Sequence, residues 1–142
     1  MANVNRSLKA SIDATSAIQS GNKIPKLPGD PMRANQAIAA AAVPVRIDPT
    51  TGDMVPASGD SAPNARLIGF TGKGYVEDEP VTVFRQNSVF YYSDDFSADG
   101  VSPDDDLFLG TGGLLADTAL ANSGEPVARV LDNHHILITR AA

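Results

Sequence analysis

The stretch "PVTVFRQNSVFYYS", residues 80–93, decides how the rest of the chain is interpreted. Its first half alternates apolar and polar residues, the polar triplet Gln86-Asn87-Ser88 follows, and a new apolar run begins at Val89. Two short runs rich in β-branched and aromatic residues on either side of a polar turn are typical of a β-hairpin. We therefore predict two consecutive strands that pair with each other.

The same strand-turn-strand pattern recurs between Val43 and Thr139, in "VPVRIDPTTGDMVPA" (43–57), "DDLFLGTGGLLADTAL" (105–120) and "PVARVLDNHHILIT" (126–139). Asp48, Pro49 and Gly52 supply turn chemistry in the first of these. The stretch "ARLIGFTG" (65–72) predicts a single short buried strand. Strand signals at this spacing, about every 10 to 15 residues, predict an all-β domain, either a small barrel or a sandwich. The run "NQAIAAAAVPVRIDP" (35–49) is ambiguous, because its alanines favour helix and "VPVRI" favours strand.

The first 33 residues differ from the rest. Large apolar residues are sparse there, and the residues from about Ser7 to Gln19 are compatible with a short helix that ends at Gly21. The prolines of "KIPKLPGDP" (23–31) then favour extended geometry. We predict that residues 1–33 form an extended or partly helical N-terminal arm that orders on a partner. Residues 34–142 form the β domain.

The charge is divided in the same way. The chain of 142 residues has a net charge of −6, yet residues 1–33 hold five basic and two acidic residues. The negative net charge argues against general nucleic-acid binding, and a basic arm on an acidic body suggests either two different neighbours or one neighbour touched in two ways. No signal-peptide core and no apolar run of about 18 residues is present, so we expect a soluble protein made in the cytoplasm, with no membrane partner.

The glycine-rich stretch "LGTGGLLAD" (109–117) resembles a phosphate-binding loop only superficially. A P-loop needs Lys and then Ser or Thr after its last glycine, and here Gly113 precedes two leucines. We predict a tight turn at Thr111-Gly112-Gly113, with backbone φ angles above zero.

No other stretch assembles a reaction centre. The acidic run 94–106 matches a calcium loop in part, but Ser102 stands where an apolar residue is usual, and strands flank the run. His134 and His135 lack a third histidine for zinc, and cysteine is absent from the chain. Without a nucleophile, base and oxyanion donor in a recognisable pattern, we expect no enzyme, no cofactor and no structural metal.

Taken in order, the β segments resemble the small decoration (cement) proteins of tailed-bacteriophage capsids. The resemblance covers residues 34–142 through "VPVRIDPTTGDMVPASG", "ARLIGF", "EPVTVFRQNSVFYYSDDF", "DLFLGTGGLLADTA" and "EPVARVLDNHHILIT". Two departures concern turn geometry, since Ala128 and the triplet 86–88 stand where the family favours glycine. The N-terminal arm matches no motif of the family.

The resemblance implies a β-tulip or small-barrel fold and a structural, non-catalytic role. It implies binding to the major capsid protein on the outer surface of the expanded shell, as a homotrimer with a dimer as the alternative, within the virion. The arm residues expected to contact the capsid are Arg6, Leu8, Lys9, Ile12, Ile18, Lys23, Ile24, Lys26 and Leu27. The alternative left open is a carbohydrate- or host-surface-binding β domain of a virion, with Tyr91, Tyr92 and Asp94 as its platform.

Overall fold

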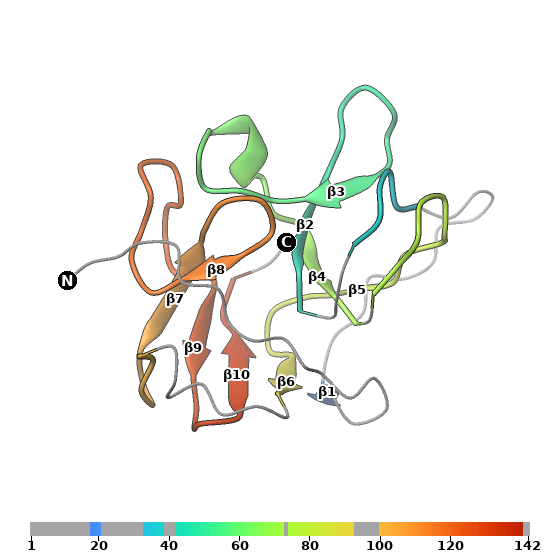
Figure 1. The fold of residues 1–142 in the computed structure, drawn as a ribbon. Coiled ribbons are helices and arrows are strands. Elements are labelled where there is room, and N and C mark those ends of the chain that lie inside the picture. Colours follow the sequence, from blue (N-terminus) through green and yellow to red (C-terminus); the bar gives the residue numbers. More distant parts are fainter. Residues whose placement is uncertain (1–17, 21–32, 39–41, 73, 93–99, 141–142) are drawn as a thin grey trace.

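The computed structural model is an all-β protein with two antiparallel sheets (Figure 1). It describes residues 18–20, 33–38, 42–72, 74–92 and 100–140. The six-stranded sheet has the order β1-β6-β10-β9-β7-β8, and the four-stranded sheet has the order β3-β2-β4-β5. The strands are β1 (Ile18–Ser20), β2 (Pro44–Ile47), β3 (Met54–Pro56), β4 (Gly69–Thr71), β5 (Val83–Phe84), β6 (Val89–Tyr91), β7 (Asp106–Leu109), β8 (Leu115–Ala116), β9 (Ala128–Val130) and β10 (His135–Ile138). One 3₁₀ helix, η1, spans Pro63–Ala65.

Three of the predicted strand-turn-strand units are confirmed. The β2–β3 turn is closed by the backbone bond from Gly52 N to Asp48 O at 2.8 Å, and Gly52 has a φ of +78°. In the β7–β8 turn, Gly112 and Gly113 have φ angles of +54° and +84°, as the predicted tight turn requires. Hairpin β9–β10 pairs Ile136 with Val130.

The hairpin predicted within residues 80–93 is wrong. The turn exists, but β5 pairs with β4 in the smaller sheet, whereas β6 pairs with β10 and β1 in the larger one. The reason lies in the turn, where Asn87 adopts a φ of +73° and donates its backbone N–H to Ile138 O at 2.8 Å. Ile138 N in turn donates to Ser88 O at 2.9 Å. The chain is thereby directed onto β10 instead of folding back on β5.

The N-terminal segment contributes to the larger sheet. Ile18 and Ser20 of β1 face Phe90 and Val89 of β6 across an antiparallel pair. Of the two conformations expected for the arm, extended or partly helical, residues 18 and 19 have the extended one, since their backbone is paired with a strand. The earlier residues of the helix considered from Ser7 to Gln19 lie outside the described part. The ambiguous run 35–49 contains strand β2, and residues 39–41 of it lie outside the described part.

The main core lies between the two sheets. Phe90 of β6 is fully buried and packs against Phe70 of β4 and Phe84 of β5, with ring centroids 6.4 and 6.2 Å apart. Tilted and edge-on aromatic pairs of this kind contribute about 0.5–1.5 kcal/mol beyond area burial. The remaining buried members of this cluster include Leu107, Leu109, Leu115, Val127, Val130, Ile136 and Ile138.

A second core covers the opposite face of the four-stranded sheet. Val83 points into it, whereas its neighbour Phe84 points into the main core, as alternation along a strand requires. The cover comes from segments 33–38 and 75–81, where Ile38 and Tyr75 exchange two backbone hydrogen bonds of 2.9 Å. The smaller sheet is therefore buried on both faces.

The two sheets are also joined through close backbone contacts. Gly59 donates to Gly110 O at 2.7 Å, and a Cβ at position 59 would lie 2.5 Å from Leu109 O. Gly113 donates to Ala57 O at 2.8 Å, so the β7–β8 turn is hydrogen-bonded to the chain just after β3. A Cβ atom at position 59 or 113 would come too close to neighbouring atoms, so glycine is required at both positions.

Candidate functional sites

Only one of the nine predicted arm residues lies in the described part of the chain. It is Ile18, whose backbone is paired with β6 as described above. The others, Arg6, Leu8, Lys9, Ile12, Lys23, Ile24, Lys26 and Leu27, lie outside the described residues. The segment predicted to be an arm therefore also contributes to the sheet of its own chain. Arg33, the last residue of that segment, donates from Nη1 to Asp78 O at 2.9 Å.

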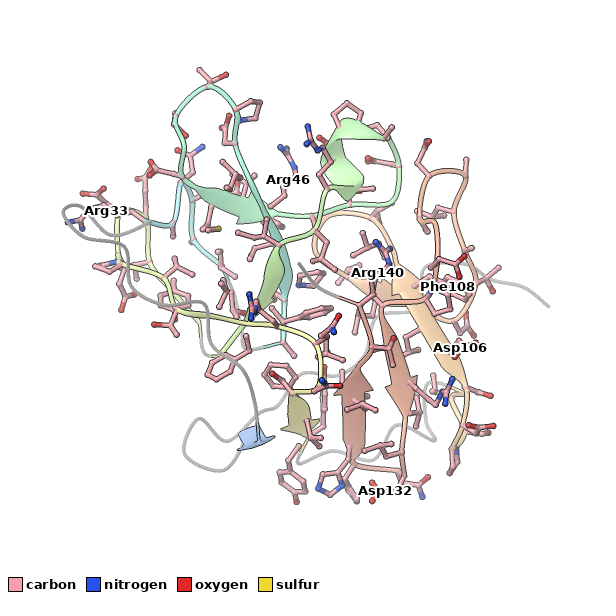
Figure 2. All side chains as sticks on the ribbon, turned by 180° about the vertical axis from the view of Figure 1, so that it is seen from behind. Arg33, Arg46, Asp106, Phe108, Asp132 and Arg140 are labelled. Carbon is pink, nitrogen blue, oxygen red and sulfur yellow. The ribbon has the colours of Figure 1, made fainter. Side chains whose placement is uncertain are left out.

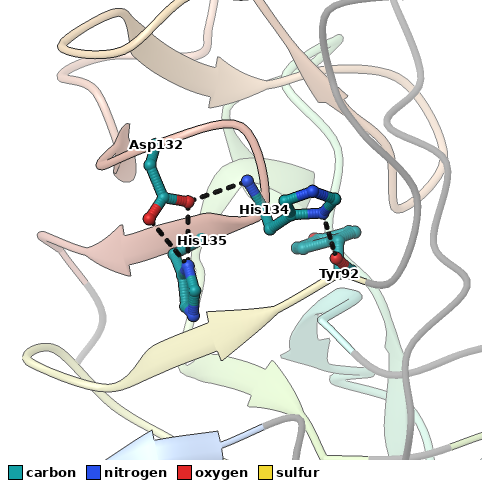
Figure 3. A network of polar contacts seen from close by, with 4 residues as sticks. All are labelled: Tyr92, Asp132, His134 and His135. Atoms are coloured by element: carbon teal, nitrogen blue, oxygen red, sulfur yellow. Dashed lines mark hydrogen bonds and ion pairs between the residues drawn. The ribbon is translucent and has the colours of Figure 1, made fainter.

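A polar cluster surrounds the β9–β10 turn (Figure 3). Asp132 Oδ1 accepts the backbone N–H of His134 at 2.8 Å, and both carboxylate oxygens accept from His135 Nδ1, at 2.8 and 3.0 Å. His134 Nδ1 lies 2.9 Å from the carbonyl oxygen of Tyr92 and donates to it. The Tyr91 ring lies beside both imidazoles, with centroid distances of 5.8 and 5.2 Å. The two histidines thus use their Nδ1 atoms to hold the turn.

The electrostatics of this cluster follow from its contacts. Burial tends to raise the pKa of Asp132, but the hydrogen bonds from His134 and His135 and the attraction of His135 outweigh it, so the pKa falls below its ordinary value of 3.8. Burial raises the pKa of Tyr92 above the usual range for tyrosine. The network in Figure 3 pairs a carboxylate with an imidazole, and none of the four residues drawn there is a serine, threonine or cysteine.

The aromatic platform weighed for carbohydrate binding is not assembled as predicted. Tyr91 is the last residue of β6 and is half-buried, whereas Tyr92 is only 1% exposed and belongs to the main core. A ring buried in the core cannot form an exposed surface together with Tyr91. Asp94, the third member, lies outside the described residues.

The acidic run 94–106 is described only from Gly100 onward. There, Ser102 N donates to Asp105 Oδ2 at 2.9 Å, which closes a local turn. Asp104 and Asp106 lie 3.9 and 3.7 Å from Arg129 Nε on β9. Within the described ranges, no group of three or more histidine, aspartate or glutamate side chains is placed to hold a metal ion.

A third region, which the sequence interpretation missed, surrounds Arg46 of β2. Arg46 lies between two depressions, at the opposite end of the molecule from Asp132 (Figure 2). One is a cleft of about 300 Å³, which we call the Arg46–Arg66 cleft; it is lined by Arg46, Ile47, Pro49, Pro63, Arg66 and Ile68. The other is more open and polar, and its lining includes Asp48 and Asp60. The available signal was a single cation inside the otherwise apolar strand "VPVRI".

The comparisons with known proteins leave the family open. Protein-family models, curated proteins and solved structures were compared with the chain, and none matches. Within the part of the chain that the structure describes, no helix is both long and apolar enough to cross a membrane.

Proposed function

We propose that this chain is a structural virion protein that binds the outer surface of an expanded phage capsid and stabilises contacts between major capsid protein subunits. The observation that carries the proposal is the order of the five segments that resemble capsid decoration proteins. In the structure, these segments contain strands β2 to β10 of a domain with two small antiparallel sheets. The finer fold, a small barrel or β-tulip, and the absence of catalysis belong to the same proposal.

Exposed apolar side chains on the surface are suited to such contacts. Four large apolar side chains are exposed among the described residues: Ile47, Val76, Leu114 and Leu131. They come from different elements of the chain. Exposed apolar side chains of this kind suit contacts with neighbouring molecules, as in a homotrimer that bridges capsid subunits. A dimer is the alternative assembly.

The mechanism is mass action on an assembled lattice. A ligand that binds only the expanded shell stabilises it by its binding free energy at every site. A trimer that bridges several subunits gains avidity, because its second and third contacts form within one complex. The basic arm adds a second contact to that of the acidic body. We place the protein on the virion surface after synthesis in the host cytoplasm.

Deletion of residues 1–17 tests the role of the arm. This deletion removes Arg6, Leu8, Lys9 and Ile12 but keeps every described strand, β1 included. We expect an unchanged thermal transition and attachment to expanded capsids at least about tenfold weaker, which equals ~1.4 kcal/mol per site. The loss appears mainly as faster dissociation in surface plasmon resonance on immobilised capsids, since the body still finds its docking surface.

Two results contradict parts of the proposal separately. If the full and the shortened chains dissociate at equal rates, the arm does not contribute to the contact with the capsid. If the full chain is folded by circular dichroism but does not bind expanded capsids, the proposed function is wrong.

A further inference from the structure

The Arg46–Arg66 cleft contains cations without partners. In the described part of the chain, neither Arg46 nor Arg66 forms a hydrogen bond or ion pair through its side chain. The Nε atom of Arg46 is moreover buried and has no acceptor. A buried donor without an acceptor costs about 1–3 kcal/mol, so the Nε atom of Arg46 lowers stability as it stands. Arg66 is exposed, and its guanidinium faces the same cleft without a partner from the described residues.

The strand geometry explains why Arg46 is held there. Pro44 of β2 pairs with Phe70 of β4, so both point to the same face of the sheet. Arg46 lies two residues further along β2 and shares that face, and it pairs with Val55 of β3. Since β2 is an inner strand, the backbone next to Arg46 is also held on its other side, where Ile68 N donates to Val45 O at 2.9 Å. The backbone that carries Arg46 is therefore fixed by its neighbours on both sides.

The walls of the cleft restrict the chemistry of the ligand. Two isoleucines and two prolines line it together with the two arginines, and Ile47 is 44% exposed. A polyanion is disfavoured by the net charge of −6 and by Asp48 and Asp60, which line the depression on the other side of Arg46. A volume of about 300 Å³ lies at the lower end of ligand pockets and suits one or two side chains. The charge and shape fit a single carboxylate next to an apolar side chain.

We propose that the Arg46–Arg66 cleft binds a peptide segment of a partner protein in which a carboxylate is flanked by aliphatic side chains. The carboxylate accepts from the two guanidinium groups, and the aliphatic side chains pack on Ile47 and Ile68. This inference does not depend on the partner being a capsid protein.

The probe is the capped pentapeptide Ac-Gly-Leu-Asp-Leu-Gly-NH₂, titrated into the ¹⁵N-labelled full chain. The arginine Nε–Hε cross-peaks of Arg46 and Arg66 should shift and saturate, because their environment changes when a carboxylate binds. The same peptide with Asn in place of Asp should bind at least about fivefold more weakly, since charge-assisted hydrogen bonds are about twice as strong as neutral ones.

Three variants separate this site from general electrostatics. Arg66→Gln and Arg46→Gln should each weaken binding of the aspartate peptide at least about fivefold. Arg85→Gln is the matched control: it removes the same charge from an exposed residue that does not line the cleft, and it should change the affinity less than twofold. The amide spectrum of each variant checks that the fold is kept.

Several outcomes overturn the proposal. One is equal binding of the Asp and Asn peptides; another is an equal loss of affinity in Arg85→Gln. Inorganic phosphate that binds as tightly as the peptide indicates a general anion site. Shifts of the Arg46 and Arg66 cross-peaks with protein concentration alone identify a second copy of the chain as the occupant.

Discussion

The two ends of the molecule, marked by Arg46 and Asp132 in Figure 2, differ in whether their polar side chains have hydrogen-bond partners. At the Asp132 end, the carboxylate and both imidazoles are hydrogen-bonded within the chain and hold a turn. At the Arg46 end, two guanidinium groups line a cleft without a partner among the described residues. Closed polar networks rigidify a fold, whereas a buried donor without an acceptor lowers stability and is available to a ligand. The Asp132 end therefore supports a turn, and the Arg46 end is the one at which we propose binding.

The largest effect is expected from Phe90, whose ring connects the two sheets and therefore the two ends. Phe90→Ala should lower the free energy of unfolding by about 3–5 kcal/mol, since it removes a buried ring and leaves a cavity. Denaturant unfolding followed by Tyr fluorescence and by amide signals from both ends should show a single shared transition. Separate transitions for the two ends would mean that the comparison concerns two independent units.

A smaller effect of opposite sign is expected at Arg46. Arg46→Met keeps the length of the apolar stem and removes a partly buried cation that lacks a partner. We expect the free energy of unfolding to be unchanged or to rise by up to about 1 kcal/mol, because similar replacements of buried charges are often neutral or stabilising. Thermal unfolding measures it. A loss of more than about 1 kcal/mol would show that Arg46 supports the fold.

The smallest effect is expected at Asp132, and it depends on pH. Because the pKa of this carboxyl is lower in the folded state than its ordinary 3.8, its contribution is present above that pH and is lost as the pH falls through the lowered pKa. Asp132→Asn should therefore be less stable than the parent protein near neutral pH, by less than about 1 kcal/mol for such an exposed group. The difference should shrink below about pH 3.8. A difference that is constant from pH 7 to pH 3 would contradict this account.

Much of the fold could be predicted because short-range signals decide it. Alternation along the strands and the turn residues Asp48, Gly52, Gly112 and Gly113 identified three hairpins. The unit at residues 80–93 failed because sequence alternation does not specify which strand is the partner. Here the hydrogen bonds of Asn87 and Ser88 with Ile138 decide it, and Ile138 is far from both in sequence.

The candidate sites were less predictable for the same reason. Asp132, His134 and His135 are close in sequence, so the turn that they form could be predicted from the sequence. The contact of His134 with Tyr92 could not be predicted in this way. The Arg46–Arg66 cleft joins residues from β2 and from the segment after η1, twenty positions apart. Their convergence depends on the pairing of β2 with β4, which composition and spacing do not reveal.

The central claim is that the chain binds an expanded capsid. It is tested most directly by cosedimentation of the full chain with expanded shells and with unexpanded procapsids, both prepared without this protein. The account predicts that the chain pellets with expanded shells at a saturable, fixed ratio to the major capsid protein and stays in the supernatant with procapsids. A folded chain that stays in the supernatant with both shells, or pellets equally with both, would contradict it.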